Sequence, residues 1–80
     1  MEYTTIYKVY GCDTGGNPIL YAEFLNLRLA CQCAVANYGK IHYNLPEVYK
    51  YTYQYNEETK TVIADWEEIS EAQIHYMNKV

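Results

Sequence analysis

Apolar and polar residues alternate along the stretch from Val48 to Trp66, and this is the clearest pattern in the chain. Every second residue at its start is a tyrosine: Tyr49, Tyr51, Tyr53 and Tyr55. Side chains two residues apart project from one face of an extended strand. A polar segment at residues 56–59 then interrupts the alternation, and a β-favouring run resumes in which one side is formed by Val62, Ala64 and Trp66. The pattern predicts a β-hairpin.

The N-terminal part of the chain predicts a second hairpin. An alternating run from Tyr3 to Tyr10 predicts a strand, and the turn-forming sequence GCDTGGNP follows it. The next run, Ile19–Phe24, can be the return strand or the beginning of a long helix capped by Asn17. We favour the strand, because a Gly-Gly-Asn-Pro turn between apolar runs is typical of a hairpin and because Asn26 offers a later helix cap.

Apolar residues at helical spacing predict a helix from Leu27 to Tyr38, which Gly39 would end. The side of this helix opposite the predicted buried stripe is also apolar, and it carries Leu29, Cys33 and Ala36. Two interpretations stay open. A small domain can tolerate a weakly polar helix back, or the three residues can form an interface between copies of the protein.

Two shorter segments complete the predicted fold. The connector at residues 40–47 can include an extended piece at Ile41–Tyr43, and Ser70 can cap a short helix over Glu71–Asn78. The apolar edge of that helix would consist of Ile69, Gln73, Ile74 and Met77. We therefore expect a single α+β domain over residues 1–80, a hairpin-helix-hairpin (ββαββ) with an antiparallel sheet, one main helix on one sheet face and a short C-terminal helix.

Composition agrees with a small folded domain and offers little chemistry. Half of the 80 residues are apolar, and a chain of this length has room for one modest core. Cys31 and Cys33 would point about 200° apart around a helix, which makes them a poor metal clamp. We expect Cys33 to be exposed and Cys31 buried. No catalytic, metal or cofactor motif is found, so we expect a non-enzymatic protein without cofactors.

The N-terminal sequence and the charge distribution bear on location and partners. MEYTTIYKVY lacks the basic and apolar regions of a signal peptide, and no stretch is apolar enough to span a membrane, so a cytoplasmic location is expected. The net charge of −4 arises wholly in residues 47–80, where three lysines oppose seven acids: Glu47, Glu57, Glu58, Asp65, Glu67, Glu68 and Glu71. The second hairpin and its flank are therefore the acidic part of the chain.

The row of tyrosines allows two interpretations. The favoured one makes it the core face of the central hairpin, packed against the helix. The alternative leaves part of the row exposed for binding, either to stack nucleic-acid bases or to anchor a protein. The acidic hairpin would repel phosphates, so a protein with a basic surface is the better partner. The candidate protein-binding residues are Glu57, Glu58, Asp65, Glu67, Glu68, Tyr53, Tyr55 and Trp66.

A single acidic domain of this size, built as hairpin, helix and hairpin, with the acidic tract Glu57 to Glu71 and exposed aromatic residues, resembles the small phage-encoded inhibitors of the anti-CRISPR type. The resemblance implies an inhibitor that occupies the basic, nucleic-acid-binding surface of a host defence protein such as a CRISPR-Cas effector, in the host cell cytoplasm. Two alternatives remain. One is a homo-oligomeric structural or accessory protein of a phage or mobile element that associates through the apolar helix back. The other is a single-stranded nucleic-acid binder that uses exposed tyrosines.

Overall fold

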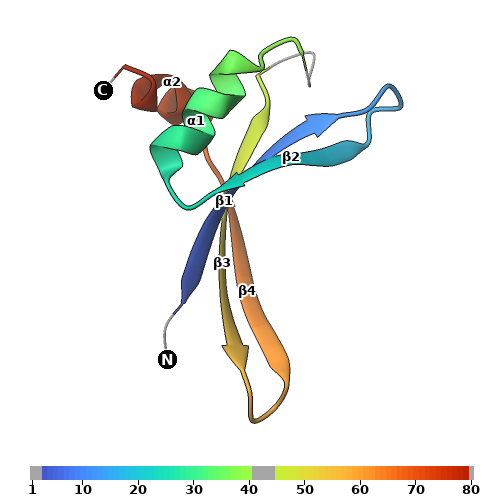
Figure 1. The fold of residues 1–80 in the computed structure, drawn as a ribbon, viewed down its shortest axis with the longest axis vertical. Helices are drawn as coiled ribbons and strands as arrows, with labels where there is room; N and C mark the ends of the chain where they lie inside the picture. Colours follow the sequence, from blue (N-terminus) through green and yellow to red (C-terminus); the bar gives the residue numbers. More distant parts are fainter. Residues whose placement is uncertain (1–2, 41–44, 80) are drawn as a thin grey trace.

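The computed structural model describes residues 3–40 and 45–79, and it shows one four-stranded antiparallel sheet with two helices (Figure 1). In chain order the elements are β1 (Thr4–Cys12), β2 (Pro18–Phe24), α1 (Leu27–Ala36), β3 (Glu47–Asn56), β4 (Thr61–Glu68) and α2 (Glu71–Met77). The strand order in the sheet is β2-β1-β3-β4. The α+β prediction is confirmed, and so is the strand, rather than a helix, after Pro18. The predicted extended piece at Ile41–Tyr43 lies outside the described residues.

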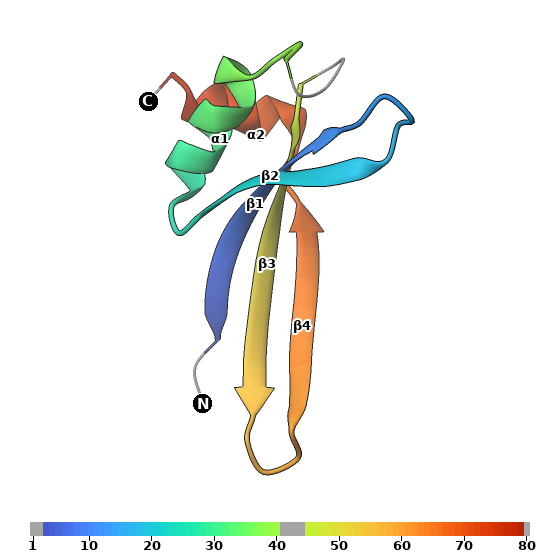
Figure 2. The same cartoon turned by 45° about the vertical axis from the view of Figure 1, so that its right-hand side comes forward.

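The two helices lie together at one end of the molecule, and the β3–β4 hairpin extends away from them (Figures 1 and 2). α1 packs on one face of the sheet and α2 packs against α1. The small core between them has the buried residues Val9, Ala30, Cys31, Ala34, Leu45, Val48, Ile69 and Ile74. The molecule measures 44 × 34 × 16 Å. Because the core occupies only the helical end, the far part of the hairpin is exposed on both faces, as Val62 and Ile63 show at 55% and 57% exposure.

Local hydrogen bonds explain where the two hairpins turn. The Asp13 carboxylate accepts from the backbone N–H groups of Gly15 (2.9 Å) and Asn17 (2.8 Å), and Gly16 adopts a φ of 83° that favours glycine. In the second turn, Asn56 Oδ1 accepts from the backbone N–H groups of Glu58 (2.9 Å) and Thr59 (3.3 Å). Both turns are therefore built by a side chain that hydrogen-bonds its own following backbone.

Side-chain caps also set the limits of the helices. Asn26 Oδ1 accepts from the backbone N–H of Leu29 at 3.1 Å and begins α1, as predicted. The helix ends at Ala36, two residues earlier than predicted, where the Asn37 side chain donates to the carbonyl of Cys33 at 2.8 Å. Ser70 caps α2 through a 3.2 Å hydrogen bond from the backbone N–H of Gln73. Neither described helix is long and apolar enough to cross a membrane.

The register of β1 with β3 decides which face of β3 the helices cover. Val9 pairs with Val48, and both are fully buried beneath the helices. Since strand side chains alternate between faces, Tyr49 and the tyrosines that follow it project from the opposite face. The favoured interpretation of the tyrosine row as the core face is therefore wrong. The physical reason is that α1 contributes the small buried side chains Ala30, Cys31 and Ala34 to the core, and the β3 residue that fills the space beneath them is Val48.

Candidate functional site

Aromatic side chains gather on the face of the sheet opposite the helices, which we call the open face. Five of them form a continuous aromatic cluster across three strands: Tyr10 of β1, Tyr49, Tyr51 and Tyr53 of β3, and Trp66 of β4. The Tyr51 and Trp66 ring centroids lie 4.4 Å apart, because these residues are directly paired across β3 and β4. Tyr53 stacks on Tyr51 at 5.4 Å along the strand. The open face therefore carries one connected aromatic surface.

A lysine of the same face lies over this cluster. Lys8 Nζ is 4.5 Å from the ring centroid of Tyr51 and 5.0 Å from that of Trp66. The same ammonium group lies 3.5 Å from a carboxylate oxygen of Glu23, which pairs with Lys8 across β1 and β2. These distances fit a cation–π contact combined with an ion pair. The open face thus holds one cation of its own chain by two rings and a carboxylate.

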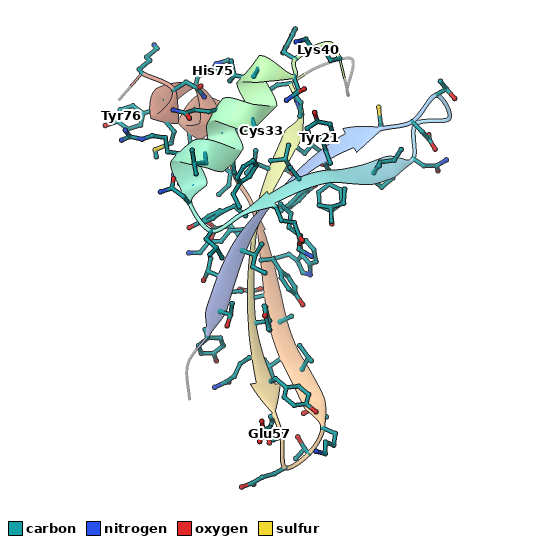
Figure 3. All side chains as sticks on the ribbon, viewed as in Figure 1. Tyr21, Cys33, Lys40, Glu57, His75 and Tyr76 are labelled. Atoms are coloured by element: carbon teal, nitrogen blue, oxygen red, sulfur yellow. The ribbon has the colours of Figure 1, made fainter. Side chains whose placement is uncertain are left out.

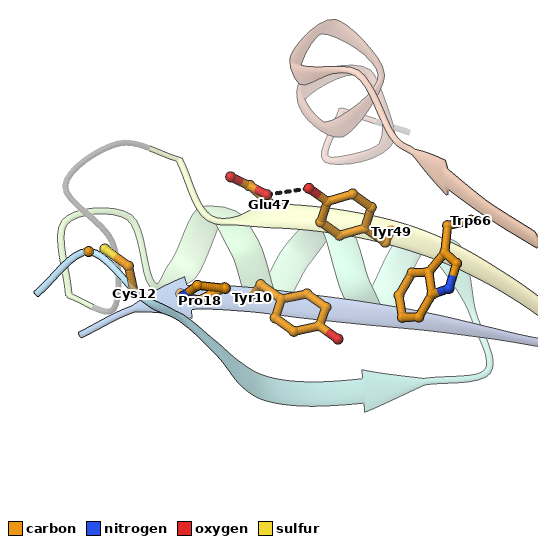
Figure 4. A pocket seen from close by; sticks show the side chains of 8 residues that line it. Tyr10, Cys12, Pro18, Glu47, Tyr49 and Trp66 are labelled. Atoms are coloured by element: carbon orange, nitrogen blue, oxygen red, sulfur yellow. Dashed lines mark hydrogen bonds between the residues drawn. The ribbon is translucent and has the colours of Figure 1, made fainter.

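Next to Lys8, the cluster borders a pocket of about 440 Å³ (Figure 4). Its side-chain walls are formed by Tyr10, Cys12, Pro18, Glu47, Tyr49 and Trp66. Tyr49 meets both other rings nearly at right angles, with centroids 5.7 Å from Tyr10 (82°) and 6.1 Å from Trp66 (79°). The pocket therefore combines three aromatic side chains with one carboxylate, that of Glu47.

A short hydrogen bond fixes the carboxylate in this pocket. The Tyr49 hydroxyl donates to Glu47 Oε2 at 2.5 Å, as Figure 4 shows. This hydrogen bond, followed by burial and the negative charges of Glu47 and Glu68, raises the pKa of Tyr49 to about 12. The tyrosine stays protonated and keeps donating to Glu47 at neutral pH, so the carboxylate is held in one orientation.

Strand alternation divides the predicted acidic binding residues between two faces. Glu68 pairs with Tyr49 and belongs to the open face, whereas Glu67, which pairs with Lys50, and Asp65 belong to the helix-bearing face. Glu57 and Glu58 lie in the turn at the far tip of the hairpin (Figure 3). The structure therefore does not bring the five predicted acids together into one patch.

The predicted aromatic residues do share the open face. Tyr53 and Trp66 belong to the cluster, and Trp66 is 49% exposed. Tyr55 lies further along the same face of β3 and is 47% exposed. The sequence reasoning missed Tyr10 and Glu47: Tyr10 joins the site through the pairing of β1 with β3, and Glu47 lies two residues before Tyr49 on the same face of β3. The sequence did offer one signal: Lys8 and Tyr10 are two residues apart in β1 and therefore project from the same face of the strand.

Of the three residues predicted to form an oligomer interface on α1, two are exposed and one is partly buried. Leu29 is 50% exposed and Ala36 is exposed, but Cys33 is half-buried and packs against the core. Cys33 lies about 60° around the helix axis from the buried Ala30, on the flank of the buried stripe, so the expectation that it is exposed is wrong. Cys31 is fully buried, as expected.

Cys31 and Cys33 lack the lowered pKa of a nucleophilic thiol, and residues 3–40 and 45–79 hold no group of metal-ligating side chains. Burial raises the pKa of the Cys31 and Cys33 thiols, whereas a nucleophilic cysteine requires a lowered one. No group of three or more His, Cys, Asp or Glu side chains in these residues could hold a metal ion. Comparisons of the chain with protein-family models, with curated proteins and with solved structures found no match.

Proposed function

We propose that the protein is a non-enzymatic, stoichiometric binder that docks a basic surface of another protein against the open face of its sheet. The observation that carries the proposal is the aromatic cluster on the face that the helices leave uncovered. Large, rigid aromatic side chains are the residues that most often anchor protein interfaces. In the manner of the inhibitors that the chain resembles, such docking would block a nucleic-acid-binding surface of the partner.

Charge supports a basic partner. The strands carry three carboxylates on the open face, those of Glu23, Glu47 and Glu68, but one lysine, Lys8, and the whole chain has a net charge of −4. Carboxylates around an aromatic centre speed association with a cationic surface and make it salt-dependent. The same charges repel phosphate, which disfavours the single-stranded nucleic-acid alternative despite the suitable aromatic face.

The proposal predicts that Trp66→Ala weakens binding of a polybasic probe, a peptide of alternating arginine and glycine, by about tenfold or more, because a buried aromatic anchor is worth about 2 kcal/mol. Titration calorimetry at low salt measures the affinity. The matched control is Ile63→Ala, since Ile63 lies on the same strand at 57% exposure but on the opposite face. Equal losses in the two variants would contradict docking on the open face.

Charge reversal offers a second matched pair in the same experiment. Glu68→Lys, on the open face, should slow association and reduce the salt dependence more than Glu67→Lys, which is adjacent in sequence but projects from the other face. If single-stranded DNA binds in preference to the polybasic peptide, the nucleic-acid alternative replaces this proposal. If neither probe binds and the free protein sediments as a dimer that Leu29→Lys disrupts, association through the helix back replaces it.

A further inference from the structure

The pocket between Tyr10, Tyr49, Trp66 and Glu47 matches the chemistry of a site for one cationic side chain. We infer that it binds the guanidinium group of an arginine presented by the basic partner. This inference rests on the proposed function and deepens it, because it assigns one position of the open face to one chemical group. It commits the pocket to a protein ligand rather than to a nucleotide.

The first support is that the open face already binds one cationic side chain, that of Lys8. Lys8 is already held there by two aromatic rings and the carboxylate of Glu23, at 4.5, 5.0 and 3.5 Å. The pocket repeats this combination of aromatic walls and a carboxylate, and Trp66 contributes to both. Since the open face stabilises an ammonium group in this way, it has the chemistry to stabilise a second cation in the pocket.

The second support is the position of the Glu47 carboxylate. The Tyr49 hydroxyl donates to Glu47 Oε2 at 2.5 Å, which holds this acceptor group at the pocket wall in one orientation. Glu68, opposite Tyr49 across β3 and β4, adds a second negative charge beside the site. A buried cation needs a hydrogen-bonded counter-charge, and a carboxylate held in one orientation supplies it at low entropic cost.

The shape favours guanidinium over ammonium. Tyr10 and Trp66 both stand nearly perpendicular to Tyr49, at 82° and 79°, so the aromatic rings that line the pocket are not coplanar. A planar guanidinium can stack on one ring face and direct its N–H donors at a carboxylate in its own plane, which a compact ammonium cannot do. The volume of about 440 Å³ also admits a long side chain together with part of the backbone that carries it.

The test uses three blocked tripeptides with glycine on both sides of arginine, lysine or citrulline. Citrulline has nearly the shape of arginine but no charge. Amide NMR of the whole protein should show the arginine peptide shifting residues that line the pocket, with an affinity at least about threefold above that of the lysine peptide and at least about tenfold above that of citrulline. Equal binding of arginine and citrulline, or shifts confined to other residues, would overturn the inference.

Variants make the assignment specific. Glu47→Gln should lower the affinity for the arginine peptide by about tenfold. Glu57→Gln makes the same charge change at the far hairpin tip and should leave that affinity unchanged. Both positions are exposed, and the amide spectrum verifies folding. If Glu47→Gln leaves arginine binding intact, or a dinucleotide binds the pocket instead, the inference fails. If the affinity for the polybasic peptide still depends on Trp66 while the arginine tripeptide does not bind, the assignment of an arginine site is wrong. The proposed function is then still supported.

Discussion

At the scale of single residues, a short hydrogen bond links Tyr49 to Glu47 on the open face. The hydrogen bond to Glu47 is the largest cause that raises the pKa of Tyr49 to about 12, against an ordinary value of about 10. The folded state therefore favours the protonated phenol. The stability that this contact contributes is complete below about pH 10 and is lost as the pH rises toward about 12.

This coupling predicts that Glu47→Gln lowers the pKa of Tyr49 toward its ordinary value, because the charged acceptor is removed while burial and Glu68 remain. NMR titration of ring-labelled tyrosines would follow the shift, with Tyr49→Phe to identify the signal. Glu57→Gln serves as the control and should leave the titration unchanged. A Tyr49 signal that still titrates near pH 12 without the Glu47 carboxylate would show that burial, and not the hydrogen bond, causes the shift.

At the scale of elements, the turn between β3 and β4 contains a residue in an unfavourable conformation. Lys60 has a φ of 58°, and no other non-glycine residue in the described part of the chain has a positive φ. A left-handed conformation costs a side-chain-bearing residue about 1 kcal/mol. The hairpin forms nevertheless, because Asn56 satisfies the turn backbone and the strands pair through eight residues on each side, from Tyr49 with Glu68 to Asn56 with Thr61.

Lys60→Gly should therefore stabilise the protein by up to about 1 kcal/mol, since glycine adopts this conformation without steric cost. Glu58→Gly, in the same turn but without a positive φ, should destabilise it by about 0.5–1 kcal/mol through the added entropy of the unfolded chain. Urea denaturation of both variants measures the difference. Changes of the same sign and size would mean that the left-handed residue stores no strain.

At the scale of the whole molecule, the core lies at one end of an extended sheet (Figure 2). Val9 and Val48 are fully buried beneath the helices, whereas Tyr55, Val62 and Ile63 are about half exposed at the other end. Among the described residues, the pairing of β1 with β3 reaches Thr4 and Tyr53, so in the part of the chain that the structure describes the far hairpin consists of β3 and β4 alone. An isolated two-stranded hairpin is only marginally stable in water.

Backbone hydrogen bonds should therefore open more often in the far hairpin than beside the core. We expect hydrogen-bonded backbone amides of the far hairpin, around Tyr55 and Val62, to exchange at least about tenfold faster than those next to Val9 and Val48. Native-state hydrogen exchange followed by NMR would test this. Uniform protection along β3 would show that the hairpin is stabilised along its whole length, for instance by association of two copies at the exposed end.

The sequence by itself determined most of the helices and strands, because these depend on interactions between residues that are close in the chain. Alternation identified β1, β3 and β4, the Gly-Gly-Asn-Pro turn favoured the strand β2, and Asn26 and Ser70 marked the N-caps of α1 and α2, because a cap or a turn depends on residues a few positions apart. The prediction of α1 extended two residues too far because the Asn37 side chain closes the helix before Gly39 is reached. Trp66, Tyr53 and Glu68, which the sequence suggested as protein-binding residues, lie on the open face, and their binding stays a prediction.

Only the tertiary structure decided which face of β3 is covered and what the site contains. An alternating strand offers two faces, and nothing local to residues 48–55 says that Val48, rather than the tyrosines, meets the helices. That choice depends on the register with β1 and on the small side chains of α1, which pack on valine. The same long-range pairing brings Tyr10 to Tyr49 and Trp66, and so forms a pocket from residues that are more than fifty positions apart in the sequence.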